Sequence, residues 1–267
     1  MSSTSTCRGF STFWSLPGRR MEENVALADT SLMGVGWMEW PANACITYKE
    51  MGYMKIVAVT ANPDPLSMTN AAGNALLDGA AEGGAQTELI DLCAEGFNPV
   101  YGMEDREHYL GRGPMPDDVL AMQSRIRDAD ALALVFPIYW YTMPAIMKGF
   151  FDRVLCRGFS YDADGTPGAL AGKTIRIVML SGGGEDWYRS SGIGQALDNQ
   201  IRQQTFIKYC QAGDVSFTYI DNLRSGDDEP EARQAADRHL VSLALMGREL
   251  ALGDRTSAES GDAGARS

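Results

Sequence analysis

Short apolar runs recur along the middle of the chain, and longer segments with apolar residues at helical spacing separate them. The runs are rich in Val, Ile and Leu, which is typical of strands buried on both faces of a sheet. We therefore predict strands over residues 55–60, 87–92, 131–136, 174–180 and 215–220.

The segments that follow these strands predict helices, because their apolar residues repeat with a helical period. The last of them carries acids at its start and Arg248 near its end, which matches the helix dipole. The predicted helices span residues 70–81, 117–127, 144–155, 195–210 and 230–250. Strands that alternate with helices predict a parallel sheet covered on both faces. Five such units predict an α/β fold with the flavodoxin-like strand order 2-1-3-4-5.

The two ends of the chain differ from this pattern. Residues 1–53 mix Ser, Thr, Gly and isolated Trp without a sustained period, and residues 252–267 have the composition of disorder. The first residues are faintly similar to a transit peptide, but they contain no apolar signal core. We expect residues 1–53 to be a disordered extension, or to be included only because the start codon was assigned too far upstream. The folded domain is expected over residues 54–251, with a disordered tail after it.

Charge and hydropathy exclude two classes of partner. The formal net charge is −12 and the sequence pI is about 4.6, and no basic stripe occurs, which argues against binding to nucleic-acid phosphates. No run of about 18 apolar residues occurs, so no membrane span is predicted.

The five cysteines occur singly, without a CxxC or CxxH motif. This pattern favours a reducing compartment over a disulfide framework or a zinc site, and we expect a cytoplasmic protein. Because the chain has only two histidines, we expect no histidine-based metal centre.

The segment 136–155, FPIYWYTMPAIMKGFFDRVL, joins two prolines, three consecutive aromatic residues and an amphipathic helix. Pro137 ends the preceding strand because it cannot donate to a sheet ladder, and Pro144 suits the first turn of a helix. Loops at the carboxyl ends of strands bind flat ligands in open α/β sheets. The alternative is a tight turn with an aromatic mini-core, and this segment alone does not decide between the two.

Two further loops have the same ambiguity. After the first strand, Ser67, Thr69 and Asn70 place hydroxyl and amide groups where a helix begins, which suits a phosphate. The same residues also serve as a helix N-cap without any ligand. After the fourth strand, the three glycines of residues 182–184 allow a flat ligand to approach the backbone, or they form a flexible turn.

These motifs resemble those of the flavodoxin-like NAD(P)H:quinone oxidoreductases, a family that includes the ancillary oxidoreductases of bacterial potassium-efflux systems. The resemblance covers residues 54–251, and its most specific stretch is the aromatic segment. The matching stretches are NPDPLSMTN at 62–70, FPIYWYTMPAIMKGFFDRV at 136–154, GFSYDADGTPGALAGK at 158–173 and LSGGGEDWY at 180–188.

The resemblance implies that three loops hold a flavin, either FMN or FAD. The first loop would cradle its phosphate, the second would lie along the ring, and the third would present backbone N–H groups to the polar edge of the ring. The residues implied to bind the cofactor are Asn62, Ser67, Met68, Thr69, Asn70, Gln123, Pro137, Ile138, Tyr139, Trp140, Tyr141, Leu180, Ser181, Gly182, Gly183 and Gly184.

The resemblance also implies the reaction, in which NAD(P)H gives a hydride to the flavin and a quinone then takes it in a ping-pong cycle. Tyr188 would donate a hydrogen bond to the ring edge, and Tyr161 would close the far side of the substrate pocket. A half-buried aromatic residue with no chemical role is the alternative for Tyr188. Family members form homodimers, and Phe150, Phe151 and Phe159 would supply apolar area for the contact.

Two positions depart from the family pattern. Asn62 stands where members usually have His, so this side chain donates a hydrogen bond but carries no charge. Gly194 stands where a histidine commonly follows the tyrosine, so a proton relay through both residues would lack one partner.

Other functions use the same scaffold. An azoreductase or nitroreductase would use the same flavin and loops. A one-electron flavodoxin-type carrier and a redox-sensing regulatory subunit belong to other functional classes. The sequence leaves open the choice between FMN and FAD, the choice between NADH and NADPH, and the physiological acceptor.

Overall fold

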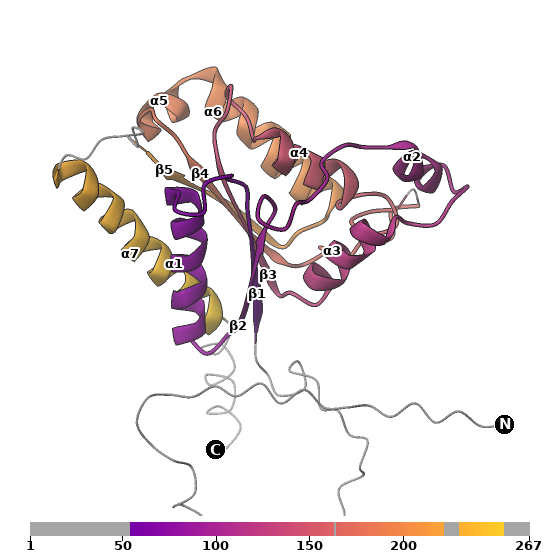
Figure 1. Cartoon of the computed structure of the whole chain (residues 1–267), viewed down its shortest axis with the longest axis horizontal. Coiled ribbons are helices and arrows are strands. Elements are labelled where there is room, and N and C mark those ends of the chain that lie inside the picture. The colour runs from indigo at the N-terminus through magenta and orange to yellow at the C-terminus, as the bar shows by residue number, and fades with distance from the viewer. Residues whose placement is uncertain (1–53, 163, 222–229, 254–267) are drawn as a thin grey trace, which may run out of the picture. The chain divides into compact units, whose positions relative to one another are not determined.

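The computed structural model describes residues 54–162, 164–221 and 230–253, which form one five-stranded sheet with helices on both faces (Figure 1). The predicted extension over residues 1–53 and most of the predicted tail lie outside the described residues.

All five strands are parallel, and their order is β2-β1-β3-β4-β5, which confirms the predicted fold. The central strand β3 is buried along its length up to Pro137, as its unbroken apolar sequence predicts. The strands are β1 (Lys55–Thr60), β2 (Gln86–Asp91), β3 (Ala131–Pro137), β4 (Thr174–Leu180) and β5 (Asp214–Ile220).

The helices agree with the sequence pattern except in three places. A short helix, α2, lies between β2 and α3, where the sequence pattern predicts no helix, and another, α5, follows the glycine-rich loop. The helix predicted over residues 195–210 is divided into α6 and a π-helix, η1. The elements are α1 (Met68–Glu82), α2 (Met103–Tyr109), α3 (Asp117–Arg127), α4 (Ala145–Arg153), α5 (Glu185–Ser190), α6 (Gly192–Leu197), η1 (Asp198–Tyr209) and α7 (Pro230–Leu252).

Helices α1 and α7 lie side by side on one face of the sheet (Figure 1). A Cβ atom on Gly79 would collide with the carbonyl group of Ala244, and one on Gly247 would collide with the carbonyl oxygen of Leu76. Small residues therefore let the two backbones touch, and the layer over β1 is thin and tightly packed.

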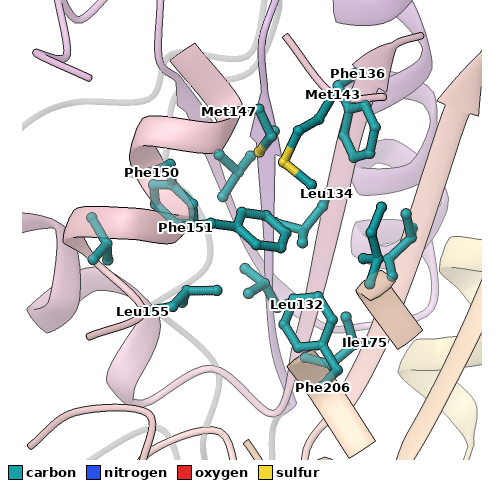
Figure 2. Close-up of a cluster of buried hydrophobic side chains, with 14 of the residues drawn as sticks. Leu132, Leu134, Phe136, Met143, Met147, Phe150, Phe151, Leu155, Ile175 and Phe206 are labelled. Atoms are coloured by element: carbon teal, nitrogen blue, oxygen red, sulfur yellow. The ribbon is translucent and has the colours of Figure 1, made fainter. Parts of the chain in front are cut away.

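Large side chains fill the opposite face (Figure 2). The rings of Phe151 on α4 and Phe206 on η1 meet edge to face, with their centroids 5.6 Å apart. Phe150, Phe151 and Phe159 are all buried in this core. The expectation that they supply a dimer contact is therefore wrong, because their area is already covered within one chain.

A buried arginine fixes the segment around α2. Arg153 Nε donates to Asp105 Oδ1 on α2 (3.1 Å), and its Nη1 donates to Asp118 Oδ2 on α3 (2.6 Å). Nη1 also donates to the carbonyl oxygen of Asn98 (2.7 Å). The hydrogen bond from Arg153 holds the pKa of the Asp118 carboxyl below its usual value. These contacts explain why a short polar helix forms here without an apolar period of its own.

Candidate functional site

The loops after β1, β3 and β4 begin side by side at the carboxyl edge of the sheet. Pro137 and Leu180 are register partners, and the Ile138 N–H extends the ladder by donating to the Leu180 carbonyl (2.8 Å). The Ala61 N–H donates to the Val135 carbonyl (3.2 Å), so the first loop starts next to the second. The three predicted ligand loops are therefore neighbours in space.

The loop after β1 is organised by its own polar side chains. Ser67 is the N-cap of α1, and its Oγ accepts a hydrogen bond from the Asn70 N–H (3.2 Å). Asn62 Nδ2 donates to Thr69 Oγ1 (3.2 Å), and Asn62 Oδ1 accepts from the Asp64 N–H (3.0 Å). Because the Thr69 oxygen is the acceptor, its hydroxyl proton remains available to donate to an anion.

Two polar atoms of this region have no hydrogen-bond partner among the residues that the structure describes. They are Thr60 Oγ1, at the end of β1, and Asn70 Oδ1, in the first turn of α1, and both are buried. Asn70 Nδ2 already donates to the Asp64 carbonyl (3.1 Å). The Thr60 hydroxyl can donate to an anionic group such as a phosphate, whereas Asn70 Oδ1 is an acceptor and cannot. Sequence reasoning missed Thr60 because it reads as an ordinary strand residue.

The loop after β3 is a tight two-residue turn with strained backbone. The Tyr139 N–H donates to the Thr142 carbonyl (2.9 Å), and the Thr142 N–H donates back to the Tyr139 carbonyl (3.1 Å). Trp140 and Tyr141 between them have φ angles of 47° and 65°. This left-handed pair is typical of a type I′ turn, in which Asn-Gly is the usual sequence. Two aromatic residues there cost about 1–2 kcal/mol each, and such strain is characteristic of functional sites.

The turn exposes aromatic surface instead of burying it. The Trp140 side chain is 93% exposed, while Tyr139 and Tyr141 are half exposed. The alternative reading of an aromatic mini-core is therefore wrong for these three residues. Ile138, by contrast, is partly buried and packs against the core.

The Tyr141 ring connects the turn to the loop after β4. Its centroid lies 6.2 Å from that of Trp187 on α5, and Trp187 meets Tyr188 edge to face at 5.0 Å. The Tyr188 ring in turn stacks on Tyr219 of β5 at 5.7 Å. The second and third loops thus share one row of aromatic rings.

The loop after β4 is held near its start. The Ser181 N–H donates to the Ile220 carbonyl (2.9 Å), and Ser181 Oγ donates to the Gly183 carbonyl (2.8 Å). A Cβ on Gly183 would lie 3.6 Å from the Tyr188 ring, so the glycine backbone lies next to this tyrosine. The three glycines of residues 182–184 thus expose backbone without side chains at the carboxyl edge of the sheet, where the aromatic turn also lies.

Tyr188 is nearly buried on α5. Burial raises the pKa of its phenol above the ordinary value, and the nearby Tyr141 adds to the rise. Tyr188 is therefore a neutral hydrogen-bond donor at pH 7. Gly194 has no room for a side chain, because a Cβ there would collide with the Tyr188 carbonyl oxygen. A histidine at this position would therefore require the backbone to shift.

Gln123 lies apart from the three loops. It is only 2% exposed, and its Nε2 donates to the Val154 carbonyl (2.9 Å) and contacts Cys156 Sγ (3.4 Å). Val154 follows the C-terminal end of α4, whereas the aromatic turn precedes the start of that helix. Nine helical residues separate the two ends by about 13 Å. Within one chain this amide takes part in a buried contact between α3 and α4, and its expected place at the flavin stays a prediction.

Tyr161 also lies at the far end of α4. Its ring meets Tyr209 edge to face at 5.5 Å, and burial raises the pKa of its phenol. Together with Tyr101, His108 and Arg157 it lines a cavity of about 250 Å³. Within one chain, Tyr161 is thus not brought to the three loops.

The described residues contain neither a membrane-spanning helix nor a cluster of metal-binding side chains. No helix within residues 54–162, 164–221 and 230–253 is both long and apolar enough to cross a bilayer. The same ranges hold no group of three His, Cys, Asp or Glu side chains arranged to bind a metal ion.

The chain is similar in sequence and in fold to several known proteins. A ribosyldihydronicotinamide dehydrogenase (quinone) of Pongo abelii is 31% identical over 162 residues, which are 54% of this chain and 70% of that protein. An uncharacterized NAD(P)H oxidoreductase of Haemophilus influenzae is 29% identical over 72% of this chain and 93% of its own length. The solved NAD(P)H:quinone oxidoreductase from Methanothermobacter marburgensis superposes with a TM-score of 0.67 at 25% identity, covering 74% of this chain and 97% of that one.

The sequence model of one protein family, described by its flavodoxin-like fold, matches residues 54–243. This match covers most of the chain and includes all five strands and all three loops. The chain therefore belongs to the family of proteins with this flavodoxin-like fold.

Proposed function

We propose that this chain is a flavin-dependent NAD(P)H oxidoreductase that reduces quinones. The observation that carries the proposal is that three loops meet at one edge of the sheet. The loop after β1 offers hydrogen-bond donors, the loop after β3 offers aromatic rings, and the loop after β4 offers glycine backbone. The relatives named for quinone and NAD(P)H chemistry support the same class of reaction.

The loop after β1 would hold the flavin phosphate. The Thr69 oxygen accepts from Asn62, which leaves the hydroxyl proton available to donate, and the N–H groups of Met68 and Thr69 begin α1 without a partner inside the helix. Asn62 stabilises the loop, because its amide nitrogen donates one hydrogen bond and its amide oxygen accepts another within this segment. A neutral residue at this position keeps the loop in shape without adding positive charge.

The loops after β3 and β4 would hold the ring from two sides. Trp140 and Tyr141 offer exposed aromatic faces, and the glycine backbone of residues 182–184 offers N–H groups without side chains that would block approach. These residues fit the flat ring and polar edge of FMN or FAD. A bound flavin would supply the two-electron chemistry that accepts a hydride from NAD(P)H and delivers it to a quinone.

The chain would contribute orientation and a hydrogen bond. The Tyr188 hydroxyl and the glycine N–H groups would stabilise negative charge at the polar edge of the ring, because donors fixed in advance cost no reorganisation. The exposed aromatic face would receive NAD(P)H first and the quinone after it. A single surface used in turn by both substrates gives ping-pong kinetics.

Steady-state kinetics of the flavin-loaded protein test this proposal. With both NADH and a soluble quinone varied, double-reciprocal plots are expected to be parallel, and parallel runs with an azo dye and a nitroaromatic compound define the acceptor class. A flavin-loaded protein that oxidises neither NADH nor NADPH in the presence of any of these acceptors would contradict the proposed activity and favour an electron carrier.

A further inference from the structure

One carboxylate outside the three loops reaches the start of α5. Asp221 directly follows the last residue of β5, and its Oδ2 accepts a hydrogen bond from the Glu185 N–H (2.8 Å). Glu185 is the first residue of α5, and the N-cap residue before it, Gly184, has no side chain with which to cap the helix. Asp221, just after β5, therefore supplies a side-chain acceptor at the start of a helix whose N-cap glycine has none.

The end of β5 holds the glycine loop at both of its ends. The Ser181 N–H, at the start of the loop, donates to the Ile220 carbonyl, and the Glu185 N–H, at its end, donates to the next residue, Asp221. The four residues from Ser181 to Gly184 thus span two anchors that are adjacent in the chain. Glycines have the widest backbone freedom, so such anchors decide which way their N–H groups point.

The second carboxylate oxygen of Asp221 lies on another element. Its Oδ1 is 3.7 Å from His239 Nε2 on α7, so the side chain lies between α5 and α7. The cap is also electrostatic, because a carboxylate at a helix N-terminus interacts favourably with the helix dipole. Neither property is visible in the sequence, where Asp221 is one acid in the polar stretch DNLRSGDDEPE.

We propose that Asp221 is a positioning residue for the glycine loop, and that it sets the orientation of the N–H groups that receive the flavin ring. This role rests on the proposed function, since it matters only if the loop binds a flavin. Asp221 itself touches neither ring nor substrate; it acts through the Glu185 N–H and the loop attached to it.

The test compares flavin dissociation constants, measured by fluorescence titration with FMN and FAD, for the full-length wild type and three variants. Asp221→Ala removes the acceptor and is expected to weaken flavin binding about five- to tenfold, the loss typical of one N-cap acceptor. Asp221→Asn keeps an oxygen acceptor and is expected to restore affinity to within about twofold of the wild type.

Asp91→Ala is the matched control. Asp91 ends β2 and caps the turn after it, with its Oδ1 accepting from the N–H groups of Cys93 and Ala94 (3.0 Å each), but that turn is not one of the three loops. We expect this variant to lose thermal stability while its flavin affinity stays at the wild-type value.

The outcomes separate the two proposals. Flavin uptake by the wild type with equal affinity in Asp221→Ala overturns the positioning role and leaves the proposed function standing. Equal losses of affinity in Asp221→Ala and Asp91→Ala also overturn it, because a general loss of stability would then explain both. A wild type that takes up no flavin overturns the proposed function and this role together.

Discussion

The loops after β1 and β3 start side by side at one edge of the sheet, but they are built on opposite principles. In the first, the side chains of Asn62 and Ser67 hydrogen-bond to other groups of the same loop and of the helix start. In the second, Trp140 and Tyr141 adopt left-handed backbone and leave their rings in solvent. The first loop would keep its shape for purely structural reasons, whereas the second has no structural benefit that explains its strain.

The difference shows where function is visible in the structure. An N-cap network stabilises α1 whether or not a ligand binds, so the first loop alone is ambiguous. A strained turn that exposes three aromatic residues is costly for the isolated chain, and a flat ligand on those rings would account for it. The second loop therefore carries more of the functional argument, and the first loop gives the ligand its polar end.

The largest effect is expected from Ser67→Asp, which separates the capping role of the first loop from ligand binding. Aspartate caps a helix as well as serine does, so the thermal stability of the flavin-free protein should change little. Its charge would face the flavin phosphate, and like charges about 4 Å apart near a protein surface cost up to several kcal/mol. Titration should show flavin affinity reduced at least about a hundredfold.

The control for this prediction is Ser67→Ala, which removes the cap and should lower stability by about 1 kcal/mol with a smaller effect on affinity. If Ser67→Asp binds flavin as tightly as the wild type, the first loop is only a helix cap.

A second, smaller effect is expected from Tyr188→Phe, which removes only the phenol hydroxyl. This variant tests whether Tyr188, in the row of aromatic rings beside the strained turn, donates a hydrogen bond during the reaction or only packs. Loss of one hydrogen bond to developing charge should slow quinone turnover about tenfold while flavin stays bound. Because burial raises the pKa of the Tyr188 phenol above its ordinary value of about 10, the phenol keeps its proton at neutral and mildly alkaline pH. The wild-type rate should therefore show no loss from this group as the pH rises from about 7 to about 9.

Tyr219→Phe is the matched control, because Tyr219 stacks on Tyr188 but lies on β5 outside the three loops. Unchanged rates in Tyr188→Phe, or equal losses in both variants, would reduce Tyr188 to a packing residue.

The smallest effect is expected from Tyr141→Gly, which measures the strain of the second loop directly. Glycine adopts positive φ without cost, so the free energy of unfolding of the flavin-free protein should stay constant or rise by up to about 1 kcal/mol. Tyr109→Gly, at a similarly exposed position within α2, should instead lower it by about 1 kcal/mol. Denaturant unfolding that gives the same loss for both variants would show that the turn stores no strain.

The sequence predicted the sheet well because its strands are encoded locally. The apolar runs at β1 and β4 gave the observed bounds, β3 and β5 each extend one residue further at one end, and β2 is shifted by one residue at both ends. Parallel strands covered on both faces leave continuous apolar runs, which is the clearest local signal in this chain. The α2 helix escaped prediction because of its polar sequence MEDREHY, in which only Asp105 is buried, against the distant Arg153.

The site was only partly predictable. The loops could be located, since the ends of parallel strands must meet at one edge. Gln123 could not be assigned, because a glutamine on the buried face of a helix reads the same whether it binds a ligand or a backbone carbonyl such as that of Val154. The role proposed for Asp221 also depends on a contact across 36 residues, which no local pattern encodes.

The central claim is tested most directly by titrating the flavin-free protein with FMN and with FAD while recording the absorption spectrum of the bound flavin. We predict uptake of one flavin per chain, with a spectrum distinct from that of free flavin because the ring would lie against Trp140 and Tyr141. A protein that remains colourless and takes up neither flavin would contradict the account.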